Sequence, residues 1–208
     1  MDGWTNPTKP GKMTTFFGLE NDERGLRIAG RGLCEYEVLR DGENTMSLTL
    51  HRGVDQLGDW GYFPTPDAQC KGTLTVEYSF VPFAQKKADR ERAVNSAYLF
   101  AAYAPNAVCE KAHEGTLPAF DTLLGLSGSG YIVSAVKMAE DRDSVIVRIF
   151  NPYEYDAKMK LDLGGKFEAV YNVNLNEERQ SKVIVRNGVC TIPASSKKIV
   201  TIELVPVK

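Results

Sequence analysis

The sequence predicts a mainly β protein: an antiparallel β-sandwich portion followed by a small C-terminal β-sandwich, with one helix. Three observations lead to this prediction. Apolar and polar residues alternate with period two along most of the chain. A single long segment departs from that alternation and takes helical spacing. After residue 140, five short β-like runs follow one another at close, regular intervals. We therefore expect two parts, residues 1–139 and 140–208.

The first part contains three long alternating runs, residues 33–40, 43–52 and 72–83. Asp41-Gly42 separates the first two, and an Asp-Gly pair between alternating runs is a strong hairpin signal. Pro82 ends the third run. The pattern predicts three neighbouring antiparallel strands with one solvated face.

The one predicted helix covers residues 86–103, which are rich in Ala and in long side chains. Val94, Ala97, Tyr98 and Ala101 recur at helical spacing. The irregular stretch that follows, residues 104–118, is the kind of long loop that often forms a contact or a lid.

The second half returns to β patterning. Two runs, 119–126 and 131–139, are separated by the sequence SGSG, which we interpret as a turn because glycine readily takes positive φ. The five shorter runs of the predicted small sandwich are residues 144–151, 157–164, 166–173, 182–192 and 197–207.

Composition excludes several classes of function. With 25 basic and 27 acidic residues and a net charge of −2, the chain lacks the basic excess of a nucleic-acid-binding protein. No apolar run approaches the roughly 18 residues that span a bilayer, and the first residues lack the apolar stretch of a secretory signal. We expect no contact with nucleic acid or membrane.

Cysteine and histidine usage gives two further expectations. The four cysteines, Cys34, Cys70, Cys109 and Cys190, form no CxxC pair and are expected to be free thiols, mostly buried, in a cytoplasmic protein. The two histidines, His51 and His113, are not spaced as metal ligands. We therefore expect no metal or other cofactor in this chain.

The stretch 51–72 combines a cation, acids, aromatic residues and prolines between two β-like runs. Its candidate functional residues are Arg52, Asp55, Asp59 and Trp60, and Pro64 stiffens the segment by fixing φ. Arg52 with the two aspartates is equally explained as a local surface ion pair, and the aromatic residues as a cover for the end of a sandwich.

No catalytic constellation is evident in the sequence. Ser47 and His51 lie four residues apart on a β run, about 13 Å, which excludes a direct hydrogen bond in an extended strand. Among the 27 acids, no pair is singled out for glycoside hydrolysis.

Several segments, in order, resemble the C-terminal β region of glycoside hydrolase family 38, the α-mannosidases. They are GLRIAGRGLCEYEV, LTLHRGV, LGDWG, TPDAQCKG, EYSFVPF, SAVKMAEDRDSVIVRIFN, VNLNEE and KKIVTIEL. The resemblance covers the chain from about Phe16 to Val205.

The resemblance implies that this chain is the non-catalytic end of a longer, retaining, zinc-dependent enzyme that hydrolyses terminal α-mannosides. The sandwich of residues 1–139 would then be part of a larger supersandwich. The zinc ligands and the nucleophile would lie in an N-terminal catalytic domain of the same polypeptide, against which this region packs. Loops of this region would approach the active-site cleft, and we expect the segment from Arg52 to Trp60 to border the mannose site.

Two other hypotheses remain open. The chain could be an independent carbohydrate-binding β-sandwich that uses Trp60 and its neighbours, or a small stand-alone hydrolase. The low histidine count argues against the hydrolase.

Overall fold

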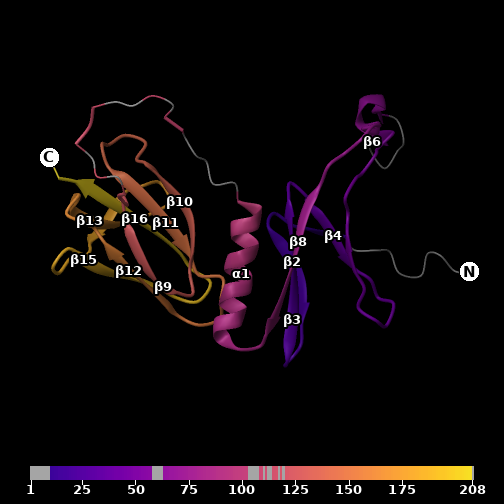
Figure 1. Cartoon of the computed structure of the whole chain (residues 1–208), viewed down its shortest axis with the longest axis horizontal. Helices are drawn as coiled ribbons and strands as arrows, with labels where there is room; N and C mark the ends of the chain where they lie inside the picture. The colour runs from indigo at the N-terminus through magenta and orange to yellow at the C-terminus, as the bar shows by residue number, and fades with distance from the viewer. Residues whose placement is uncertain are drawn as a thin grey trace, which may run out of the picture. The chain divides into compact units, whose positions relative to one another are not determined.

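The computed structural model describes residues 10–57, 63–102, 108, 109, 111, 114–116, 118 and 120–207. By its internal contacts the chain divides into two units, Met1–Val108 and Cys109–Lys208 (Figure 1). All strand pairs in both units are antiparallel among the described residues, and one α-helix is present there. The predicted fold class, mainly antiparallel β with one helix, is confirmed. The boundary near residue 140 stays a prediction.

The described residues of unit 1 form two three-stranded sheets and a short two-stranded hairpin. One sheet has the order β2-β3-β8 and the other β1-β4-β5. The strands are β1 (Gly11–Lys12), β2 (Phe16–Glu20), β3 (Arg24–Arg31), β4 (Glu35–Val38), β5 (Met46–Leu48) and β8 (Glu77–Ala84).

The hairpin expected around Asp41-Gly42 is confirmed. Strand β4 pairs with β5, with Tyr36 opposite Leu48, and Gly42 has φ 84° in the connecting turn. The prediction that the third run, residues 72–83, neighbours this hairpin is wrong. Its strand, β8, pairs along its whole length with β3 instead. Residues 24–31 contain three arginines and two glycines, so their alternation was too weak to predict this central strand.

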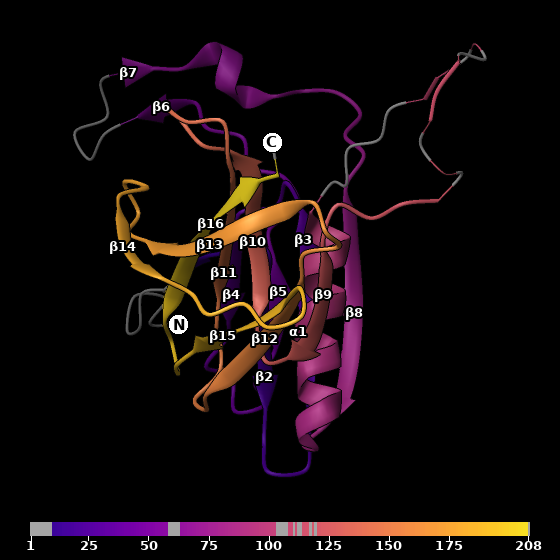
Figure 2. The same ribbon diagram turned by 90° about the vertical axis from the view of Figure 1, so that its left-hand side faces the viewer.

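The predicted helix is confirmed as α1 (Lys87–Ala101). It packs along β3 and β8, covering one face of the β2-β3-β8 sheet (Figures 1 and 2). Ala93, Val94 and Ala97 are buried there. No helix among the described residues is long and apolar enough to cross a membrane.

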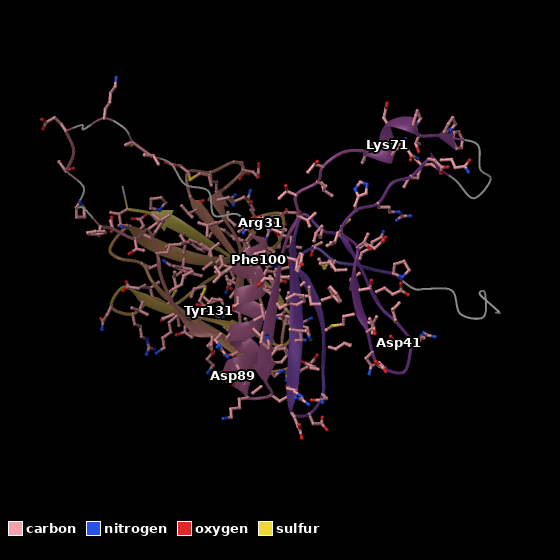
Figure 3. All side chains as sticks on the ribbon, turned by 45° about the vertical axis from the view of Figure 1, so that its right-hand side comes forward. Arg31, Asp41, Lys71, Asp89, Phe100 and Tyr131 are labelled. Atoms are coloured by element: carbon pink, nitrogen blue, oxygen red, sulfur yellow. The ribbon has the colours of Figure 1, made fainter. Side chains whose placement is uncertain are left out.

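The C-terminal end of α1 is fixed to β3 by Arg31. Its Nη2 and Nε atoms donate to the Phe100 carbonyl oxygen at 2.8 and 3.2 Å, and its guanidinium lies 4.8 Å from the Phe100 ring centroid. Figure 3 shows the two side chains together. Glu77, at the start of β8, binds the same guanidinium at 2.5 Å, so one cation joins strand, helix and neighbouring strand.

The other face of the β2-β3-β8 sheet is covered only in part. Phe17 and Ile28 are buried under a cluster that includes Met13 and Leu33, with Tyr36 of β4 stacked on Phe17 at 4.3 Å between centroids. This layer joins the two sheets of unit 1 into a small sandwich.

Unit 2 is a two-layer sandwich. One sheet has the order β10-β11-β16-β13-β14 and the other β15-β12-β9, with a single apolar core between them. The strands are β9 (Gly125–Ser129), β10 (Ile132–Met138), β11 (Val145–Phe150), β12 (Ala157–Asp162), β13 (Phe167–Val173), β14 (Arg179–Lys182), β15 (Val189–Ala194) and β16 (Ile199–Pro206). Thus two strands that precede residue 140, β9 and β10, pair with strands that follow it.

Two details of the second half differ from the sequence predictions. The SGSG stretch is largely strand, because β9 extends to Ser129. The predicted strand 182–192 is broken by a two-residue turn at Asn187 and Gly188, both at positive φ, where Arg186 and Val189 exchange backbone hydrogen bonds. Asn-Gly is the standard pair for such a turn, and that signal was missed.

The cysteines are free, as expected, but most are not buried. Only Cys190 lies in a core, where burial raises the pKa of its thiol. Cys34, Cys70 and Cys109 are exposed, so the expectation of mostly buried thiols is wrong. Cys34 lies in the loop before β4, and a loop position is solvated unless another element covers it.

A fully buried carboxylate organises the outer face of the larger sheet of unit 2. Ile202 and Leu204 of β16 enter the core, so Glu203 between them points to the opposite face. Arg179 binds it through Nε and Nη2 at 2.7 and 2.9 Å, and Ser144 Oγ donates at 2.8 Å.

A second arginine completes the shell around Glu203. Arg142 Nε donates to the carboxylate at 3.1 Å, and its Nη2 donates to the Glu177 carbonyl oxygen. The bonds from Arg179, with those from Ser144 and Arg142, lower the pKa of Glu203 from the ordinary 4.5 to about 2, although burial acts in the opposite direction.

Replacing Glu203 with Gln is expected to destabilise the chain by about 3 kcal/mol at neutral pH, because two arginines lose their counter-charge. The stabilisation from the ionised carboxylate is present above pH 4.5 and is lost as the pH falls through 2, so the difference from wild type should shrink over that interval. Urea denaturation at several pH values measures it. The exposed Glu168→Gln serves as control, and equal stability of wild type and Glu203→Gln at neutral pH would contradict the prediction.

Candidate functional site

Arg52 lies beside a small pocket in unit 1, at the end of the β4–β5 hairpin away from its turn. The pocket measures about 150 Å³ and lies between two chain segments that run side by side. Its lining residues are Gly32, Leu33, Cys34, Glu35, Thr49, Leu50, His51 and Arg52. The hairpin register creates this arrangement, because Thr49 N donates to the Glu35 carbonyl oxygen at 3.1 Å just beyond β5.

Glu35 is the polar centre of this pocket. Its Oε1 accepts from Thr49 Oγ1 at 3.0 Å, and its Oε2 accepts from Arg52 Nη1 at 3.0 Å. The Glu35 side chain is 28% exposed, whereas that of Arg52 is 69% exposed. A half-buried carboxylate, oriented by a threonine, therefore holds one edge of the guanidinium and leaves the rest at the surface.

The arrangement suits recognition of oxygen-rich groups. A guanidinium has five N–H donors in a planar fork, and the one ion pair described for Arg52 uses a single nitrogen. The remaining donors can bind sugar hydroxyls or a carboxylate of a facing domain.

The segment after Arg52 forms a short arm instead of an irregular loop. Strand β6 (Gln56–Leu57) pairs with β7 (Phe63–Pro64), and the 3-10 helix η1 (Pro66–Gln69) follows. Figures 1 and 2 show this arm projecting from the rest of unit 1. Its base is closed by backbone bonds from Val54 N to the Ala68 carbonyl and from Thr65 N to the Asp55 carbonyl.

The arm presents apolar side chains to solvent. Leu57 and Phe63 are directly opposite each other in the hairpin and are 59% and 66% exposed. Asp59 and Trp60, two of the predicted site residues, lie outside the described residues.

The structure brings some of the predicted residues together and separates others. Arg52 pairs with Glu35, seventeen residues earlier, and no bond is described between it and Asp55, whose side chain is exposed. The sequence did not point to Glu35 or Thr49 as site residues. The Asp41-Gly42 turn carried the needed signal, since extending its register places positions 35 and 49 opposite each other.

Clusters of metal-ligand side chains are absent from the part of the chain that the structure describes. No group of three or more His, Cys, Asp or Glu side chains lies close enough to hold a metal ion there. The described residues therefore do not fit a zinc site.

The chain is similar over nearly all its length to part of several longer proteins. Residues 130–202 match the family profile described as "Glycosyl hydrolases family 38 C-terminal beta sandwich domain". A protein of Halalkalibacterium halodurans named "Putative mannosylglycerate hydrolase" is 33% identical over 205 residues, 96% of this chain but 21% of that protein.

Two solved structures give the same result. The crystal structure of an alpha-mannosidase from Enterococcus faecalis matches with a TM-score of 0.77 and 29% identity, over 98% of this chain and 22% of that one. A glycosyl hydrolase family 38 protein from Enterococcus faecalis matches with the same score and identity, over 95% of this chain and 23% of that one. This chain thus spans about a fifth of the length of these relatives, and the resemblance to the family 38 C-terminal region is confirmed.

The exposed position of Arg52 predicts a small role in folding. Arg52→Ala in this chain should change the free energy of unfolding by less than about 1 kcal/mol, because exposed ion pairs contribute little. Denaturant titration measures this. A loss of 2 kcal/mol or more would show that the pair holds the hairpin together and would contradict the prediction.

Proposed function

We propose that this chain is the C-terminal, non-catalytic β region of a family 38 glycoside hydrolase that removes terminal α-mannosyl residues. One observation carries the proposal: 95–98% of the chain is matched by relatives of which it spans only 21–23%, and these are named as a mannosylglycerate hydrolase, an alpha-mannosidase and a family 38 protein. A match that covers nearly all of this chain but only a small part of each relative is expected of a region within a larger enzyme.

The remainder of the full-length enzyme would contain the chemistry. By the family resemblance we assign to it the zinc ion, the nucleophile of a retaining mechanism and the main contacts to the mannoside. The present chain would pack against that catalytic domain. A cytoplasmic location is supported by the four cysteines, which form no disulfide, as is typical of reducing compartments.

Arg52 is the residue of this chain that we place closest to the substrate, at the rim of the mannose site. Glu35 positions it by accepting from Arg52 Nη1 at 3.0 Å. Thr49 orients Glu35 in turn, because its hydroxyl donates to the other carboxylate oxygen at 3.0 Å. Asp55 and Asp59 would bond across the domain contact, and Trp60 with Pro64 would form the wall of the rim. The exposed Leu57 and Phe63 support this placement, because apolar side chains at the end of an arm are typical of a surface that another domain covers.

This chain alone is expected to be inactive toward an aryl α-mannoside, with or without added zinc, whereas the full-length enzyme hydrolyses it. Release of the aryl group, followed by absorbance, measures both. If the isolated chain hydrolysed the aryl α-mannoside and a chelator abolished this activity, the assignment would be overturned.

The alternative, an independent carbohydrate-binding module, is tested by calorimetric titration of the isolated chain with methyl α-mannoside. That alternative requires heat of binding.

In the full-length enzyme, Arg52→Ala should lower kcat/KM by one to two orders of magnitude, about 1.4 to 2.7 kcal/mol of transition-state stabilisation. Its fold should be intact by circular dichroism. Arg40→Ala, an exposed arginine at the turn end of the same hairpin, is the matched control and should leave kcat/KM unchanged. If Arg52→Ala had wild-type kinetics, Arg52 would form only a surface ion pair and would have no role at the mannose site.

A further inference from the structure

Strand β8 exposes an apolar strip on one face. Its residues alternate, so Phe83 points toward α1 and is buried, whereas Tyr78, Phe80, Pro82 and Ala84 point to the other face and are all exposed. Tyr78 is 46% and Phe80 60% exposed. The strip is about 20 Å long at roughly 3.4 Å per residue.

The strip belongs to the face of the β2-β3-β8 sheet that the layer of β4 and β5 covers over β2 and β3. Phe80 lies directly opposite Ile28 of β3, and opposite residues in an antiparallel pair point to the same face. Ile28 is 4% exposed because the layer of β4 and β5 lies over β2 and β3. That layer stops before β8, so one half of this sheet face is a core and the other half is in solvent.

The strip is poorly suited to a sugar ring. The rings of Tyr78 and Phe80 are 5.6 Å apart at an interplanar angle of 78°, so they form no common flat platform on which a pyranose could stack. An edge-to-face pair of this kind is typical of apolar protein packing.

The edge of β8 is open as well. Among the described residues, β8 pairs with β3 only and is the last strand of its sheet. Pro82 lies within it, and prolines in strands are found at sheet edges because they cannot donate to the ladder. Packing onto the face therefore suits this strand better than addition of a further strand at its edge.

We propose that the β8 strip, Tyr78, Phe80, Pro82 and Ala84, is covered in the full-length enzyme by an apolar layer from the polypeptide that precedes this chain. The proposal rests on the proposed function only in that such a preceding segment exists. The relatives have about four fifths of their length outside the matched region. A segment of the same polypeptide has a high effective concentration at this face, unlike a second molecule.

Thermal unfolding of four proteins provides the first test. Phe80→Ser should lower the thermal midpoint of the full-length enzyme by roughly 5 °C and leave that of this chain alone unchanged, because the side chain is already exposed there. Phe83→Ser, on the buried face of the same strand, is the matched control and should lower the midpoint in both contexts. An unchanged midpoint for full-length Phe80→Ser would overturn the proposal.

A photo-cross-linking residue at position 80 of the full-length enzyme identifies the occupant without requiring a stable variant. The expected product is a cross-link, within one molecule, to a peptide that precedes this chain. Cross-links between two molecules, to residues 109–208, or to no peptide would each overturn the proposal. Hydrolysis of the aryl α-mannoside by the same preparation is scored separately, so an active enzyme without the cross-link refutes only the docking surface.

Discussion

Ile28 and Phe80 are neighbours across two paired strands and point to the same side, yet one is buried and the other is 60% exposed. This difference defines unit 1, whose central sheet has α1 on one face and only half a layer on the other. Apolar side chains contribute to stability in proportion to the area removed from water. The exposed half of the face therefore contributes little stability unless something outside the chain covers it. Such a half-covered face is expected of a region that forms part of a larger sandwich.

The candidate site depends on the same incomplete unit. Glu35, which Thr49 orients, binds Arg52 at the end of the β4–β5 hairpin but leaves the Arg52 side chain 69% exposed. Unit 2 differs, because its two sheets enclose a continuous core, and even the charge of Glu203 is fully buried among arginines. The core of unit 2 is thus enclosed by its own two sheets, whereas a sheet face of unit 1 is only partly covered within this chain.

Local patterns in the sequence predicted much of this fold and little of the site. The alternation of apolar and polar residues on both sides of Asp41-Gly42 predicted the β4–β5 hairpin, and the helical spacing of apolar residues predicted α1. The pairing of β8 with β3 could not be predicted, because it joins residues about fifty apart in a strand with weak alternation. The partner of Arg52 was missed for a similar reason: Asp55 is closer in sequence, but the hairpin register brings Glu35 to it.

Hydrogen–deuterium exchange of this chain alone and within the full-length enzyme tests the central claim most directly. If unit 1 is completed by the preceding polypeptide, amides of β8 and of residues 50–57 will exchange slowly in the full-length enzyme and rapidly in the isolated chain. Amides of β11 and β16 in unit 2 will be protected equally in both, since their core is complete. Equal exchange of β8 in the two proteins would contradict the account, because its exposed face would then have no partner.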